Sequence, residues 1–443
     1  MSFGTVQSYV ALAVFVATYA ALVLRNVGRK SAVPIWMIFL AGAAAMVLSG
    51  SIGVPEAYAA VNLQVIVFLF SMFVLVTALE ISGALEAFAS GLLRRARRPQ
   101  DVLYLSFFGF AFLSMVLMND TIALMGTPIV ITIARKTRMP VQPLLLTLAF
   151  AVTIGSAATP MGNPQNLLVA VTSGLEAPVL QFAYFLLIPV LIDLALTALL
   201  LRVIFRRDLE KVSTPIATGA EEEGEASPRD PRDPRLARKA TAAVVLTMAG
   251  ILLVNVVAIF GVQEPFGISE VSFFGAVLLL VISGRGREIL ERLDWGILVL
   301  FAGLFVLMQA VSDNGIISLA AGYLPPISVG HPAAATSSIL VSSVVLSQVL
   351  SNVPMVALYV PLMKTLGFTA SSAYAWATLA AGSTLAGNLT LLGAASNLIV
   401  AQGAERQGHR LGFLEFMKVG VLVTALDVAV LYAYLFFVVV VLA

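Results

Sequence analysis

The stretches Met-Asn-Asp-Thr-Ile at residues 118–122 and Ser-Asn-Val-Pro at 351–354 decide the fold of this chain, because each places polar groups inside a long apolar segment. Their asparagines, Asn119 and Asn352, are 233 positions apart. Further residues on either side match at almost the same offset, which indicates two related halves. The matching pairs are Phe73 and Phe305, Gly83 and Gly315, Pro128 and Pro361, Thr159 and Thr390, Gly162 and Gly393, Asn166 and Asn397, and Asp193 and Asp427.

The composition is that of a membrane protein. Apolar residues make up 60% of the 443 residues and charged residues 11%, whereas soluble proteins average about 45–50% and 25%. The apolar segments are close to the roughly 20 residues that a helix needs to cross about 30 Å of hydrocarbon, so the sequence predicts an all-α polytopic protein with about 10 transmembrane helices. The absence of cysteine excludes disulfides and thiolate metal sites. The expected spans are 6–24, 34–52, 61–80, 143–174, 178–201, 240–260, 267–284, 294–312, 372–401 and 414–442.

The basic residues predict the orientation in the inner (plasma) membrane, since short cytoplasmic loops carry the excess of Lys and Arg. With the N-terminus outside, every Lys and Arg except Lys364 falls on the cytoplasmic side. Corresponding elements are then separated by an odd number of crossings, so the second half is inverted relative to the first, as in many secondary transporters. The sequence thus predicts a first membrane repeat at 1–201, a cytoplasmic linker at 202–239 and a second, inverted repeat at 240–443.

Two paired segments, at about 102–134 and 333–364, are expected to enter the membrane and return on the same side. A re-entrant hairpin would place Asn119, Asp120 and Thr121 at one tip and Ser351 and Asn352 at the other, near the bilayer midplane. Two thin complete spans would give the same charge pattern. Ser and Asn also cap helices, so the tip residues of the second hairpin alternatively only close a turn.

Two long apolar segments, 143–174 and 372–401, are expected to be broken helices. Prolines and glycines interrupt the first between Thr159 and Asn166, and a similar stretch from Gly387 to Asn397 interrupts the second. Freed backbone groups cannot be satisfied by lipid, so each break is expected to line a polar cavity. A single interruption is often only a packing kink, but interruptions in equivalent positions of both halves point to a binding site.

Few ionisable side chains are expected inside the membrane, and such groups are usually functional. Asp120 lies at a proposed tip and is a candidate to bind substrate or a coupling ion. Asp193 and Asp427 lie within predicted helices and are either functional or structural. Both histidines, His331 and His409, lie outside the predicted core, so any bound anion would depend on helix N-termini, amides and a co-bound cation.

At these residues the chain resembles the ion-transporter superfamily that includes the arsenite permeases (ArsB), the NhaD-type sodium/proton antiporters and the divalent-anion/sodium symporters, over residues from about 30 to 440. The Asn-Asp pair followed by Thr127 and Pro128 is similar to the arsenite-permease pattern. In the divalent-anion symporters each tip has a Ser-Asn-Thr triplet, which neither tip matches completely here. The resemblance implies a homodimer, an elevator-like movement of the hairpins, and, for an arsenite permease, a possible cytoplasmic ATPase subunit.

Together these features predict a secondary transporter, not an enzyme, with arsenite or antimonite efflux coupled to protons as the first hypothesis. A sodium- or proton-coupled transporter of di- or tricarboxylates such as citrate, or of another anion, is the alternative. No cofactor, metal centre or nucleic-acid partner is expected; the partners are a small solute, a coupling cation and the lipid bilayer. Sodium is a candidate ligand of Asn119, Asp120 and Asn352. The candidate binding residues are Asn119, Asp120, Thr121, Thr159, Gly162, Asn163, Asn166, Ser351, Asn352, Thr390, Gly393, Ser396 and Asn397.

Overall fold

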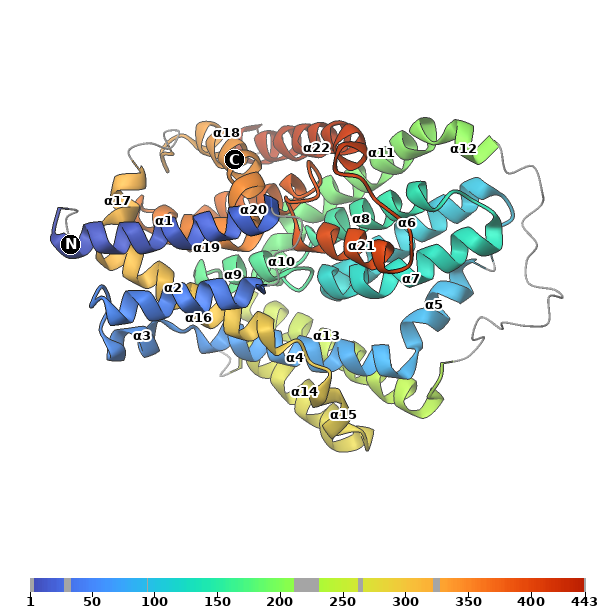
Figure 1. Cartoon of the computed structure of the whole chain (residues 1–443), viewed down its shortest axis with the longest axis horizontal. Coiled ribbons are helices and arrows are strands. Elements are labelled where there is room, and N and C mark those ends of the chain that lie inside the picture. The colour runs from blue at the N-terminus through green and yellow to red at the C-terminus, as the bar shows by residue number, and fades with distance from the viewer. Residues whose placement is uncertain are drawn as a thin grey trace.

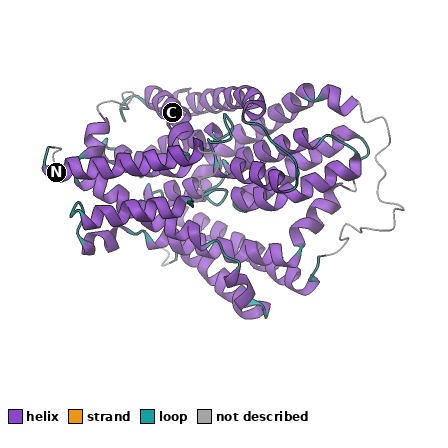
Figure 2. Ribbon diagram, in the orientation of Figure 1, coloured by secondary structure: helices purple, strands orange, loops and turns teal. Residues whose placement is uncertain are grey.

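The computed structural model describes residues 4–27, 33–93, 95–210, 231–261, 266–321 and 327–441. Over these residues the protein is helical throughout, without strands (Figure 2). The helices of the first half are α1 (Val6–Val27), α2 (Ile35–Leu48), α3 (Val54–Ala60), α4 (Leu63–Ser82), α5 (Ala84–Leu93), α6 (Pro99–Val116), α7 (Asn119–Thr137), α8 (Val141–Ser156), α9 (Pro164–Thr172), α10 (Pro178–Phe182), the π-helical turn η1 (Ala183–Leu187), α11 (Ile188–Ile204) and α12 (Arg206–Glu210).

The second half repeats this order of elements. Its helices are α13 (Pro234–Ile259), α14 (Ile268–Ser283), α15 (Gly286–Glu291), α16 (Trp295–Asp313), α17 (Ile316–Ala321), α18 (Pro332–Leu350), α19 (Asn352–Thr365), the short η2 (Ala370–Ser372), α20 (Ala373–Ala386), α21 (Ala395–Arg406), α22 (Phe413–Phe436) and η3 (Phe437–Val441). Gly83 and Gly315, paired by the sequence offset, both lie just after a long helix in the left-handed conformation, with φ of 75° and 74°. These equivalent positions therefore have equivalent backbone roles, as the predicted duplication requires.

Most helices run along the long axis of the molecule (Figure 1). The N-terminus, α3 and α17 lie at one end, and α5 and α12 lie at the other. Seven helices of the described residues are long and apolar enough to cross a membrane, and α1, α2, α8 and α14 are shorter apolar helices. The seven are Leu63–Ser82, Pro99–Val116, Pro178–Ile204, Pro234–Ile259, Trp295–Asp313, Pro332–Leu350 and Phe413–Val439.

Several predicted boundaries differ from the observed ones. The span expected at 34–52 ends earlier, because Ser49 and Gly50 turn the chain after α2 and a separate short helix, α3, follows. The helices of the first hairpin have 18 and 19 residues, about 27–28 Å each, so they are longer than a segment reaching only halfway requires. Within 202–239 the residues around the undescribed stretch 211–230 are partly helical, since α11 continues to Ile204 and α13 begins at Pro234.

The two halves are interlocked. Helix α2 packs on α16 of the other half, and α14 packs equivalently on α4. Each hairpin also reaches across, because α7 packs on α21 and α19 packs on α9. The hairpins and the broken helices therefore form one continuous body that both halves build.

One end of this assembly is fixed by a capped helix. The Asp233 carboxylate accepts hydrogen bonds from the Leu236 and Arg235 N–H groups, at 3.0 and 3.1 Å, at the start of α13. The hydrogen bond from the Leu236 N–H is the main cause that holds the pKa of Asp233 below its ordinary value. The Asp233 N–H donates to the carbonyl of Ser82 at 3.1 Å, and Arg285 lies 3.4 Å from the Asp233 carboxylate. The start of α13 is thus joined to the turn after α4 and to the loop after α14.

Close packing of α6 on α8 depends on Gly155. A Cβ atom at this position would lie 2.3 Å from the carbonyl oxygen of Ala111, which is backbone and cannot move aside cheaply. We expect Gly155→Ala to lower the stability by about 1–3 kcal/mol, measured as a lower unfolding temperature of the purified protein in detergent. The matched control is Gly330→Ala, whose Cβ would have no neighbour nearer than 3.8 Å. Equal unfolding temperatures for the two variants would contradict this packing.

Candidate functional site

The tip of the first hairpin is joined to the first helix break. The chain is extended at Leu117 and Met118, and α7 begins at Asn119. The Asn119 N–H donates to the Gly162 carbonyl at 2.8 Å, and the Thr159 hydroxyl donates to the Met115 carbonyl at 2.6 Å. Asn119 is buried, yet its side-chain oxygen has no hydrogen-bond donor. The tip is therefore held through its backbone, which leaves a side-chain acceptor unused.

The second tip has the same arrangement with different groups. Its Thr390 hydroxyl donates to the Gln348 side-chain oxygen at 2.9 Å, and Gln348 in turn donates to the Ala386 carbonyl at 2.8 Å. Gln348 occupies the position that corresponds to Met115. Asn352 is buried, and its side-chain oxygen also has no donor. Each hairpin is thus anchored to the break of its own half through a threonine of that break.

Ser351 has an unusual backbone conformation, with φ of 65° and ψ of 162°. Such a conformation costs a non-glycine residue about 1–3 kcal/mol and persists only where the surroundings hold it. Ser351 lies between α18 and α19, directly before Asn352. Backbone strain of this kind is typical of ligand-binding and active sites, so it supports a functional role for this tip.

The first break contacts the second half of the protein in the interior through Thr384, in the last turn of α20. The Thr384 hydroxyl accepts hydrogen bonds from the amides of Asn163 and Gln165, at 3.1 and 3.2 Å. It also lies 3.0 Å from the side-chain oxygen of Asn166. Neither Thr384 nor Gln348 stands out from the apolar segment around it, so the sequence alone does not identify them. The structure thus brings the first break against the second half of the protein.

The first break is saturated with internal hydrogen bonds. The Asn163 side chain caps α9 by accepting from the Asn166 N–H at 2.8 Å. The Asn166 amide donates to the carbonyls of Ser156 and Thr159, both at 3.0 Å. Gly162 is required here, since a Cβ atom would lie 2.3 Å from the Ser156 carbonyl oxygen. This break is built for rigidity.

The second break retains unused hydrogen-bonding groups. Ala394 occupies the position equivalent to Asn163 and provides no side-chain cap for α21. The Asn397 amide donates to the Gly387 carbonyl at 2.7 Å, which fixes the orientation of that side chain. The Asn397 oxygen and the Ser396 hydroxyl are fully buried and have no partner. The break of the second half, including Gly393, is thus the more open to a polar ligand.

Asp120 lies in the first turn of α7, where the positive end of the helix dipole favours an acidic group. It is half-buried, as is Thr121, and neither side chain has a hydrogen-bond partner among the described residues. No ion pair of the described residues includes Asp120. The carboxyl group is therefore free to bind a ligand or a proton.

Some predicted groupings do not appear as direct contacts. Within the described ranges no hydrogen bond joins Asn119 to Asn352. Instead, α7 of the first hairpin packs on the half-helix α21, and α19 of the second packs on the half-helix α9. The described residues also contain no group of three or more His, Asp or Glu side chains that suits a metal ion. The sodium site predicted at Asn119, Asp120 and Asn352 thus stays a prediction.

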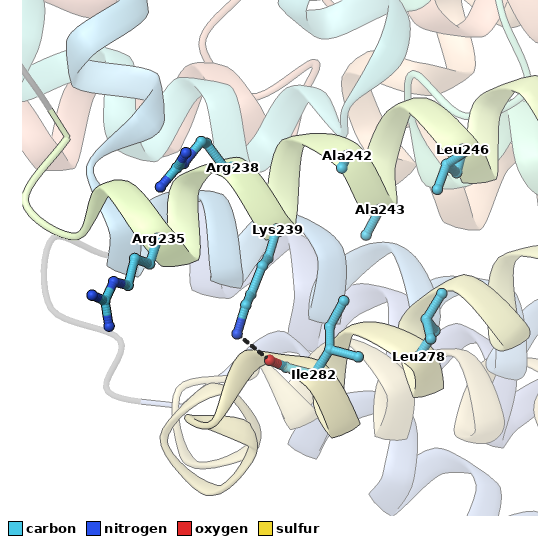
Figure 3. A pocket seen from close by; sticks show the side chains of 8 residues that line it. All are labelled: Arg235, Arg238, Lys239, Ala242, Ala243, Leu246, Leu278 and Ile282. Carbon is cyan, nitrogen blue, oxygen red and sulfur yellow. Dashed lines mark hydrogen bonds between the residues drawn. The ribbon is translucent and has the colours of Figure 1, made fainter.

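A separate groove lies between α13 and α14 (Figure 3), and none of the residues that line it belongs to a tip or a break. Its volume is about 470 Å³, with Arg235, Arg238 and Lys239 at one end and exposed apolar side chains such as Leu246 along the rest. Lys239 donates to the Ile282 carbonyl across the groove (Figure 3). Basic groups next to an apolar surface are typical of contact with anionic lipid head groups. This groove therefore differs in character from the site at the tips and breaks, whose candidate residues include no basic side chain.

The interlocked inverted halves, the paired breaks and the polar groups inside an apolar helical body define a membrane transporter. The chain belongs to the citrate transporter family (CitMHS), whose model matches residues 19–386. This match confirms the resemblance to the ion-transporter superfamily.

Relatives and a solved structure agree with that assignment. An uncharacterized transporter of Mycobacterium tuberculosis is 31% identical, covering 97% of this chain and 98% of its own. A silicon efflux transporter of rice, Oryza sativa subsp. japonica, is 26% identical and covers 90% of each chain. The crystal structure of the YdaH transporter of Alcanivorax borkumensis, described as having an unusual topology, has a TM-score of 0.58 at 14% identity and covers 98% of both chains. That structure shows the shared fold alone.

Proposed function

We propose that this protein exports a small uncharged polyhydroxyl solute, with arsenite or antimonite in the trihydroxide form as the first candidates. The observation that carries the proposal is the buried Asn397 oxygen, an acceptor with no donor, next to the unpartnered Ser396 hydroxyl. Asn119 and Asn352 add two more acceptors of the same kind. Buried acceptors require hydrogen-bond donors, which a trihydroxide supplies from three O–H groups and a fully ionised carboxylate lacks.

The similarity to a silicon efflux transporter supports both the direction and the class of solute. The proposal includes the orientation predicted from the basic residues, with the N-terminus outside and the linker in the cytoplasm. It also includes a homodimer in which α6–α11 and α18–α22 move as a body against the remaining helices. This moving body, α6–α11 together with α18–α22, contains both tips and both breaks. Such a movement would therefore carry the site across the membrane.

Transport of citrate or another carboxylate is the second candidate. The uncapped start of α21 favours it, because the free N–H groups and dipole of a helix N-terminus bind anions. The description of the family model points the same way. In this case the unpartnered amide oxygens would bind a cation that accompanies the anion.

The two candidates differ in what moves under which gradient. Purified protein in liposomes is offered arsenite, antimonite, silicic acid or citrate under an imposed proton or sodium gradient, with protein-free liposomes as the control. We expect arsenite to accumulate under the proton gradient and not under the sodium gradient. Citrate accumulation without arsenite transport would overturn the first candidate and favour the second.

A further inference from the structure

Two fully buried aspartates lie outside the site described above. Asp193 on α11 and Asp427 on α22 occupy equivalent positions in the two halves, and each has an exposed fraction of 0%. Helices α11 and α22 pack on each other and lie together in Figure 1. The pair therefore sits where the last long helices of the two repeats meet.

The partners of the two carboxyl groups are unequal. Asp427 accepts a hydrogen bond from the Asn388 amide at 2.9 Å and one from the Thr197 hydroxyl at 3.3 Å. Both oxygens of Asp193 lack a partner. Thr197 is one turn after Asp193 on the same face of α11, so the two carboxyl groups face each other across the helix contact.

No basic group compensates the pair. The nearest cations along the two helices are Arg202 and Lys418, each nine residues away, about 14 Å along the axis. No ion pair of the described residues includes either aspartate. Helices α8 and α18, which pack against this pair of helices, carry no titratable side chain. The other ionisable groups on α11, α22 and the elements packed on them are Asp101, Tyr104, Tyr184, Arg206, Arg207, Asp208, Glu210, Tyr374, Glu415, Tyr432 and Tyr434.

Two ionised carboxylates cannot be kept side by side in such surroundings, because burial without a counter-charge disfavours each and their repulsion adds to that cost. Two donors already stabilise a negative charge on Asp427. Asp193 has no donor, so it can satisfy its own polar atoms only by carrying a proton and donating it. The Asn388 oxygen is a further buried acceptor without a donor.

We propose that Asp193 and Asp427 form a proton-binding site, in which Asp193 carries the proton and Asp427 stays ionised. Binding forms a single O–H bond on Asp193, with the proton supplied by the surrounding water. The unpartnered, buried Thr424 hydroxyl, one turn before Asp427, lies beside this site. The proposal does not depend on which solute the protein carries.

The site is connected to the second break. Asn388, which donates to Asp427, belongs to the stretch between α20 and α21, and a Cβ atom at Gly420 of α22 would lie 2.3 Å from its carbonyl oxygen. Loss of the proton would leave a second negative charge beside Asp427 and weaken the arrangement that holds Asn388. Whether the Asp193 and Asp427 pair holds its proton therefore controls the position of the second break.

Infrared spectroscopy of the full-length protein in lipid vesicles at neutral pH tests the assignment without any transport measurement. The wild-type spectrum minus that of Asp193→Asn should contain a carboxylic-acid C=O band, and wild type minus Asp427→Asn should contain a carboxylate band instead. A carboxylate band in the first difference, or a carboxylic-acid band in the second, would overturn the assignment. Asp120→Asn is the control: the carboxylic-acid band assigned to Asp193 must persist in that variant.

A second measurement covers the case in which band overlap hides the signal. The folded state holds a proton that the unfolded chain releases at neutral pH, so the unfolding temperature of the wild type should fall as the pH rises. Asp193→Asn, near-isosteric and without a titratable group, should lose that part of the slope. An equal slope in both proteins would refute the proton site.

Discussion

Replacing Asn119 or Asn352 with Ala should strongly weaken substrate binding while leaving expression, folding and assembly intact. Each side-chain oxygen is buried and has no donor within the protein, so its removal breaks no internal hydrogen bond. A hydrogen bond lost at such a place leaves a donor of the bound solute unpaired and costs about 1–3 kcal/mol, which is roughly 5- to 150-fold in affinity. The measurement is substrate binding to each purified variant, compared with its unfolding temperature.

Asn314→Ala is the matched control for this pair. Asn314 is also buried, but its amide donates to the carbonyls of Ser51 and Ala310, both at 2.8 Å, at the loop after α16. Its loss should lower stability by about 1–3 kcal/mol and leave the affinity for substrate unchanged. Normal transport by both Asn119→Ala and Asn352→Ala would show that the two tips do not share one site.

The repeat offset allowed much of the fold to be predicted. Apolar segments that contain paired asparagines, 233 positions apart, and paired Gly and Pro interruptions can adopt few structures in a membrane. The reason is that lipid cannot satisfy the backbone groups that such interruptions free. The hairpins and broken helices follow from that constraint. Helix ends were less accurate, as at α2, because a turn at Ser49 and Gly50 in an apolar segment carries little signal.

The hydrogen-bonding pattern of the site could not be predicted in the same way. Thr384 and Gln348 matter through contacts with residues distant in sequence, and no local pattern reports such contacts. One sequence difference does indicate the asymmetry of the two breaks. Ala394 stands where the first half has Asn163, so α9 has a side-chain cap and α21 does not. Which acceptors stay without donors depends on side-chain geometry, and the choice between a polyhydroxyl solute and an anion depends on it.

Asp120→Asn should abolish accumulation against a gradient while preserving exchange of substrate at equal concentrations. Asp120 is the one carboxyl group at either tip, and neither a hydrogen bond nor an ion pair of the described residues holds it. A half-buried acid without a permanent counter-charge can take up and release a proton during the transport cycle. Asn keeps the shape and the hydrogen bonding of the side chain and removes the titration.

The expected accumulation ratio of the substrate follows from the size of the imposed gradient. One charge moved across 100 mV corresponds to about 2.3 kcal/mol, roughly a 50-fold accumulation ratio, and the Asn variant should fall to a ratio of about 1 under the same conditions. Exchange must survive, because binding by Asn119, Asn352 and the second break does not involve the proton. Loss of exchange as well would indicate a role for Asp120 in binding itself. Undiminished accumulation with an unchanged pH dependence would remove Asp120 from coupling and leave the Asp193 and Asp427 pair as the carboxyl groups able to perform it.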